Sequence, residues 1–210
     1  MSTRPAPVRC AGDGGAAVAE FALMLPFLAM FVFGVIDFGN AYRQENLLEG
    51  GVMTAARTNT QLARNTSADF QTLRSISETF GNMKGVTLTK VIVWKANTSN
   101  NVPANCLNLP VIATANGIPG SCNVYSPAQV TSASEVTGFG RPLGATACTT
   151  SNWDTNWCPM GRVNADGQGD YLGVYIEMTY APLTKFAFTG TITMSEQVIY
   201  RLEPPYIGGL

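Results

Sequence analysis

Hydrophobic residues are concentrated in one long run near the N-terminus of the chain. Residues 21–36 contain no charged side chain and are mostly large and apolar. A helix over residues 16–38 is about 35 Å long, which is enough to cross a hydrocarbon core of roughly 30 Å. Pro26 and Gly34 interrupt the run, and membrane helices tolerate both residue types. The pattern therefore predicts a transmembrane segment over residues 16–38.

Apolar residues then recur at helical spacing beyond this segment. Leu48, Val52 and Ala55 lie on one face of a 3.6-residue period. One helix is therefore expected from about 16 to 63, with a bend at Gly50–Gly51, because each glycine weakens a helix by about 1 kcal/mol relative to Ala.

A second helix is predicted over residues 67–81. Thr66 and Asp69 resemble a capping box at its start, and Gly81 is a plausible stop. One face of this helix is apolar, and we interpret it as a core stripe: Phe70, Leu73, Ile76 and Phe80.

The period then changes to roughly two, which is typical of strands. Three segments alternate and are rich in β-branched or aromatic residues: 86–94, 170–182 and 188–204. Three long strands after two helices predict an α+β fold, with an antiparallel sheet of three or more strands packed on the helices.

Residues 97–166 show few periodic signals and are rich in Asn, Thr, Ser, Gly and Pro. A stretch of this length is expected to be a functional insertion or to contain short strands. It holds four of the five cysteines, and four cysteines permit three disulfide connectivities. We favour pairing between sequence neighbours, Cys106 with Cys122 and Cys148 with Cys158. The spacings do not suit zinc.

Composition narrows the function classes. Charged residues make up 13% of the chain and the net charge is −1, so no nucleic-acid footprint is present. Histidine is absent, which removes the usual proton carrier of enzymes and the commonest metal ligand. We expect no enzyme activity, no cofactor and no metal site.

Three interpretations compete for the opening segment. A cleaved secretory signal lacks a convincing A-x-A site after the apolar run. A plain signal anchor explains the hydrophobicity, and Arg4 and Arg9 favour a cytoplasmic N-terminus. Neither interpretation explains Glu20 at the start of the apolar run or the glycine pair before it.

The third interpretation is a resemblance to type IV prepilins, whose polar leader ends in Gly and whose mature chain carries Glu at its fifth position. A cut between Gly15 and Ala16 makes Glu20 the fifth mature residue, followed by Phe21. The resemblance implies that residues 1–15 form a cytoplasmic leader, which contains Cys10. It also implies that Glu20 pairs with the new α-amino group of a neighbouring subunit.

The stretch "GGAAVAEFALMLPFLAMFVFGVIDFGNAYRQENLLEGGVMTAART" narrows this resemblance. Glu20 and Phe21, Pro26 six residues after Glu20, and the Asp-Phe-Gly close resemble the start of TadE-like proteins of the tight-adherence (Flp) pilus system. The resemblance covers residues 14–60. It implies a minor pilin or pseudopilin whose partners are prepilin peptidase, other minor pilins, the major pilin and the membrane assembly platform.

The same resemblance implies a bacterial inner-membrane protein with a periplasmic α+β domain over residues 39–210, able to reach the pilus or cell surface and oligomeric in a filament or priming complex. The alternative function is a membrane-anchored binding module that enters no filament. Trp153 and Trp157 are its candidate contact residues, because paired tryptophans can stack on sugars or pack against another subunit. They are equally suited to a local core.

Overall fold

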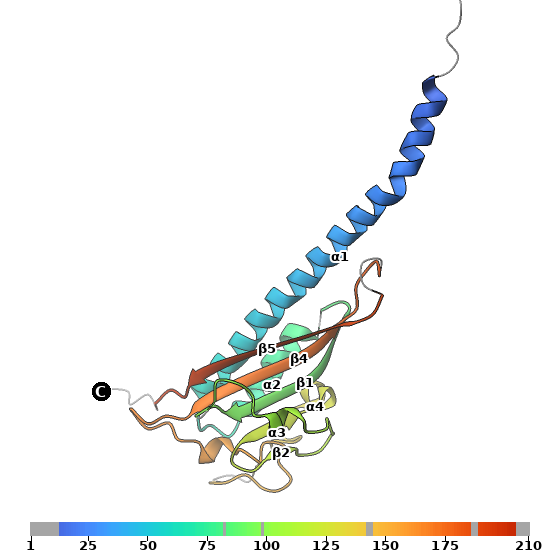
Figure 1. Cartoon of the computed structure of the whole chain (residues 1–210). Helices are drawn as coiled ribbons and strands as arrows, with labels where there is room; N and C mark the ends of the chain where they lie inside the picture. Colours follow the sequence, from blue (N-terminus) through green and yellow to red (C-terminus); the bar gives the residue numbers. More distant parts are fainter. Residues whose placement is uncertain (1–12, 82, 98, 142–144, 186–188, 205–210) are drawn as a thin grey trace, which may run out of the picture.

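The computed structural model describes residues 13–81, 83–97, 99–141, 145–185 and 189–204. Its longest element is helix α1 (Asp13–Leu62), which projects from the rest of the molecule in its first half and packs on a sheet in its second half (Figure 1). Helix α2 (Ala68–Phe80) follows and lies beside α1. The predicted long helix and the second helix are both confirmed.

Helix α1 continues through Gly50 and Gly51. The two glycines differ in their surroundings. A Cβ at Gly50 would meet nothing within 4 Å, whereas a Cβ at Gly51 would lie 2.6 Å from Cζ of Phe80. Gly51 therefore allows α2 to approach α1 closely, and this packing gives the glycine a structural role within the continuous helix.

Five antiparallel strands form one sheet in the order β2-β3-β1-β4-β5. The three predicted strands are β1 (Val86–Lys95), β4 (Tyr171–Tyr180) and β5 (Ile192–Arg201). The irregular region supplies the other two, β2 (Gly117–Ile118) and β3 (Cys122–Tyr125), and β3 pairs with β1. This region therefore completes the sheet, and it also holds the short helices α3 (Ala104–Leu107), α4 (Pro127–Ser132) and η1 (Pro159–Gly161).

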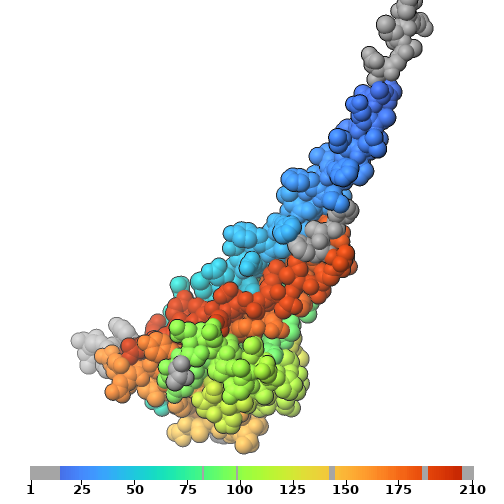
Figure 2. Space-filling view, viewed as in Figure 1, coloured from blue at the N-terminus to red at the C-terminus, as the bar shows by residue number. Residues whose placement is uncertain are grey.

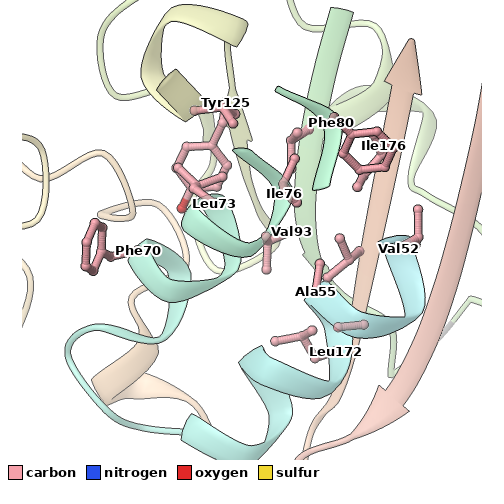
Figure 3. Close-up of a cluster of buried hydrophobic side chains, with 14 of the residues drawn as sticks. Val52, Ala55, Phe70, Leu73, Ile76, Phe80, Val93, Tyr125, Leu172 and Ile176 are labelled. Atoms are coloured by element: carbon pink, nitrogen blue, oxygen red, sulfur yellow. The ribbon is translucent and has the colours of Figure 1, made fainter. Parts of the chain in front are cut away.

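The main core lies between the helices and one face of the sheet (Figure 3). Leu172, Val174 and Ile176 of β4 point toward the helices, as the alternation in the sequence predicted. They meet the buried faces of α1 and α2, which consist of the predicted apolar residues: Leu48, Val52, Ala55, Phe70, Leu73, Ile76 and Phe80. Burial of this shared apolar surface is the largest favourable contribution to the fold.

A second, smaller core covers the opposite face of the sheet. Ile92 and Trp94 of β1 are fully buried there under residues 102–109. Gly173, which is opposite Trp94 in the register, leaves room for the indole, since a Cβ would lie 2.3 Å from the ring. The Cys106–Cys122 disulfide ties this cover to β3. The opposite face is thus covered over β1 and β3. We call residues 39–204 the α+β domain.

Candidate functional site

The first half of α1 presents an apolar surface that the described rest of the chain leaves largely exposed. Figure 2 shows it standing clear of the α+β domain. Leu23, Phe27 and Phe31 are each more than 70% exposed. By its length and composition, α1 is long and apolar enough to span a membrane, and almost none of its apolar stretch is buried. A surface of this kind requires lipid or another protein around it.

The predicted processing site lies in the first turns of α1. Gly15 and Ala16 are helical and exposed, and a Cβ at Gly15 would meet nothing within 4 Å. The rest of the predicted leader, residues 1–12 with Cys10, lies outside the described residues. The bond between Gly15 and Ala16 is therefore reachable from outside the chain.

Glu20 follows Ala16 by four residues, one helical turn and about 6 Å along the axis. Its side chain is exposed. No described residue donates a hydrogen bond to it or forms an ion pair with it. A carboxylate within an apolar membrane segment is costly and normally has a partner. Phe21 is also exposed, and Pro26 sits inside the continuous helix. The segment thus presents a carboxylate on an otherwise apolar surface.

Asp37 marks the end of this apolar segment, and it is a functional candidate that sequence reasoning missed. It is fully buried, and its carboxylate accepts hydrogen bonds from the backbone N–H (3.0 Å) and the hydroxyl (2.6 Å) of Thr184. Thr184 lies in the connection between β4 and β5, which rises alongside α1 (Figure 1). The signal in the sequence that could have identified Asp37 was a single carboxylate at the end of an apolar run. Asp37 fixes the domain to the helix at this point.

The charge on Asp37 affects the neighbouring Tyr180. Burial raises the pKa of the Tyr180 phenol, and the nearby Asp37 carboxylate raises it further. The phenol therefore stays neutral at physiological pH.

A fully buried ion pair joins the helices to the irregular region. Arg162 donates to Asp69 Oδ1 over 2.7 Å and to Asn59 Oδ1 over 2.8 Å. Asp69 Oδ2 accepts from Asn123 and from the hydroxyl of Tyr125. Both carboxylate oxygens are thus satisfied, which a buried charge requires.

Asp69 is therefore no helix cap, which corrects the capping pair expected with Thr66. The N-cap residue of α2 is Ser67, without a side-chain capping bond. Asp69 points into the core because Arg162, 93 residues later, reaches it there.

The two candidate tryptophans lie mainly inside the domain. Trp157 is 5% exposed, and the Arg162 guanidinium stacks over its ring with 4.3 Å to the centroid. Trp153 is half-buried and meets Phe139 edge-on. This arrangement is the local core that the sequence analysis gave as one of two possible roles for the tryptophans. It leaves Trp157 little surface for an external contact.

Both neighbouring cysteine pairs are bonded in the structure, Cys106 to Cys122 and Cys148 to Cys158. The second bond encloses the segment with Trp153 and Trp157. Within the described parts of the chain, no cluster of three or more potential metal ligands occurs. Asp170 accepts a hydrogen bond from Val163 N–H and forms an ion pair with Lys95.

These features define a class: an α+β domain carried on a single N-terminal helix that is apolar enough for a membrane. Residues 15–57 of the chain match the TadE-like protein family. The match contains Gly15, Ala16, Glu20 and Asp37, and it ends before the sheet begins. No curated protein and no solved structure matches the chain.

Proposed function

We propose that the protein is a minor pilin or pseudopilin that takes part in assembling a tight-adherence pilus for surface attachment. The observation that carries the proposal is the TadE-like match over residues 15–57, with Glu20 as the fifth residue from Ala16 in an uncovered apolar helix. The tight-adherence pilus system is what the TadE-like resemblance implies.

In this function a prepilin peptidase cuts the chain between Gly15 and Ala16 and frees the α-amino group of Ala16. The ammonium of one subunit then pairs with Glu20 of its neighbour. Both charges are costly in hydrocarbon when alone, and pairing offsets that cost. The ion pair sets the register between adjacent helices, whose apolar surfaces cover each other.

The proposal places the protein in a bacterial inner membrane, with its N-terminus in the cytoplasm and the α+β domain in the periplasm. Basic Arg4 and Arg9 before the apolar segment support this orientation, because positive flanks stay on the cytoplasmic side. The two disulfides support an oxidising compartment for the domain. Its partners are then the peptidase, the major pilin, other minor pilins and the assembly platform.

Two measurements test the proposal. Mass spectrometry of the protein from membranes should give a mature chain that begins at Ala16. Glu20→Ala should leave cleavage intact or reduce it in part, and it should abolish pilus assembly. Glu78→Ala is the matched control, because Glu78 is an exposed carboxylate on α2 outside the apolar segment.

A mature chain that keeps Met1 would overturn the maturation step and favour the anchored binding module. Normal piliation by the Glu20→Ala variant would overturn the role given to Glu20.

A further inference from the structure

Two opposite flanks of α1, just beyond the apolar segment, carry opposite charges. The first, which we call the acidic flank, contains Tyr42, Glu45 and Glu49. The second, the basic flank, contains Arg43 of α1 together with Lys84 of the α2–β1 connection and Leu183 of the β4–β5 connection. Successive residues of a helix are turned by 100°, so Tyr42 and Glu45 project about 100–160° away from Arg43.

Each flank borders a hollow. A groove of about 590 Å³ lies between α1 and the start of β5 on the acidic flank, and its lining includes Tyr42, Glu45 and Met194 but no basic residue. A hollow of about 360 Å³ lies on the basic flank, lined by Arg43, Lys84 and Leu183 among others, and by no acidic residue.

Each flank also offers an exposed apolar side chain. Tyr42 is 68% exposed and Leu183 is 64% exposed. Within the described chain, none of the four charged side chains (Arg43, Glu45, Glu49 and Lys84) takes part in an ion pair. The two flanks therefore have complementary charge, and each has an apolar side chain and a hollow.

The two flanks also lie at matching heights on α1. Thr184, next to Leu183, hydrogen-bonds Asp37, and the groove of the acidic flank begins one residue further along α1. Two copies standing side by side in one membrane, with their α1 helices parallel, would bring Leu183 of one opposite the groove of the other.

We propose that the acidic flank of one copy of this chain docks on the basic flank of the next copy. The contact is heterologous, because a two-fold contact would place Glu45 and Glu49 against their own equivalents. Heterologous contacts generate rings or open helical assemblies. A lipid headgroup could use the basic flank alone, whereas a second copy uses both flanks. The proposal adds an interface to the proposed function and shares with it only the parallel placement of copies in one membrane.

Cysteine cross-linking in native membranes tests the contact, using the full chain in a Cys10→Ser background. Ala41 lines the acidic-flank groove, so Ala41→Cys combined with Leu183→Cys in one chain should give a ladder of dimers, trimers and larger species under mild oxidation. The two positions lie on opposite sides of α1, which prevents closure within one chain. Either single variant should give no ladder.

The control pair is Asn46→Cys with Leu183→Cys, since Asn46 is exposed and lies outside both hollows. It should cross-link at least five-fold less than the Ala41 pair. Glu45→Lys with Glu49→Lys should reduce the ladder to the control level. Adding Arg43→Glu and Lys84→Glu to the same chain should restore it, because the charges are then exchanged and again complementary.

Equal cross-linking by the control pair, or self-linking by Leu183→Cys alone, would overturn the heterologous contact. Links to another protein with none between copies would also overturn it. The mature N-terminus and piliation of the same cells separate this result from the proposed function. Cleavage at Ala16 with normal pili but no ladder rejects only the contact, and a ladder without cleavage or pili rejects only the function.

Discussion

Asp37 and Thr184 are 147 residues apart in the chain, yet two hydrogen bonds join them where the apolar half of α1 ends. Hydrogen bonds to a charged group contribute more than neutral ones, about 1.5–3 kcal/mol each. The pair therefore determines where the β4–β5 connection attaches to α1.

Replacement of the Thr184 hydroxyl should loosen this attachment locally. Thr184→Val keeps the shape and the backbone N–H but removes the donor to Asp37 Oδ2. We expect faster amide exchange over residues 181–185, measured by hydrogen–deuterium exchange of the full chain in detergent. Thr193→Val, at an exposed position of β5, is the control and should leave exchange in this segment unchanged. Equal exchange in the wild-type chain and Thr184→Val would contradict the assignment.

Breaking the buried ion pair should cost far more than breaking an exposed one. Arg162→Met leaves Asp69 buried without its cation, and we expect a loss of about 3–5 kcal/mol in the free energy of unfolding. Arg74→Met removes an exposed i,i+4 pair with Glu78 and should cost less than about 1 kcal/mol. All three tryptophans lie in the α+β domain, so their fluorescence during urea unfolding reports on it. Similar losses of unfolding free energy in both variants would contradict the view that the buried Asp69–Arg162 pair is needed for stability.

The two adjacent glycines of α1 should respond in opposite ways to alanine. Gly50→Ala adds a methyl group in open space and should stabilise the helix by up to about 1 kcal/mol. Gly51→Ala places Cβ against the Phe80 ring, which is held in the core, and should destabilise by about 1–3 kcal/mol. Thermal unfolding of the two variants measures the difference, and a rise in midpoint for Gly51→Ala would show that the helices separate freely.

Stability of the domain should fall as the pH rises from about 4 to 6. Burial and the Asp69 carboxylate raise the pKa of Asp154 to about 6, although the Arg141 guanidinium opposes them. The folded state thus holds this proton more tightly than the unfolded state, whose aspartate pKa is about 3.9, so deprotonation favours unfolding. A shift of this size corresponds to about 2–3 kcal/mol, since one pKa unit is 1.36 kcal/mol.

Asp154→Asn should flatten this pH dependence, measured by urea unfolding at pH 4.5 and 6.5.

Asp170 changes the pH dependence of stability in the opposite direction. Burial alone would raise its pKa, but hydrogen bonds from Val163 N–H and Asn97 and the Lys95 ammonium lower it. The stability that Asp170 contributes is lost only as the pH falls below about 4, so it does not affect the comparison. A wild-type profile that rises between pH 4.5 and 6.5 would contradict the prediction for Asp154.

The sequence predicted the elements whose signal is local. Helix α2 repeats apolar residues at a helical period and strand β4 at a period of two, helix α1 begins with a continuous apolar run, and β1 and β5 alternate over part of their length. Strand β3 has only four residues, all buried, and Asn123 within it faces the helices to meet Asp69. A polar residue on the inner face hides the alternation, so the strand could not be recognised.

The buried contacts depend on partners that are distant in sequence. Asp69 looked like a helix cap because its partner Arg162 is 93 residues away, and no local pattern connects them. Asp37 stood visibly at the end of the apolar run, but only the folded β4–β5 connection gives it a role. The roles of Gly15, Ala16 and Glu20 concern a peptidase and other subunits, and they stay predictions.

Helix α1 crosses from the apolar segment into the core of the α+β domain without a break. Its last 24 residues extend about 36 Å. Under the proposed function, in which residues 16–38 span the membrane, this part of the helix would carry the domain away from the bilayer surface. A tilt of about 20°, which is average for membrane helices, would swing the far end of the domain sideways by about 12 Å. In that arrangement, small changes in the tilt of the apolar segment would produce large displacements of the domain parallel to the membrane.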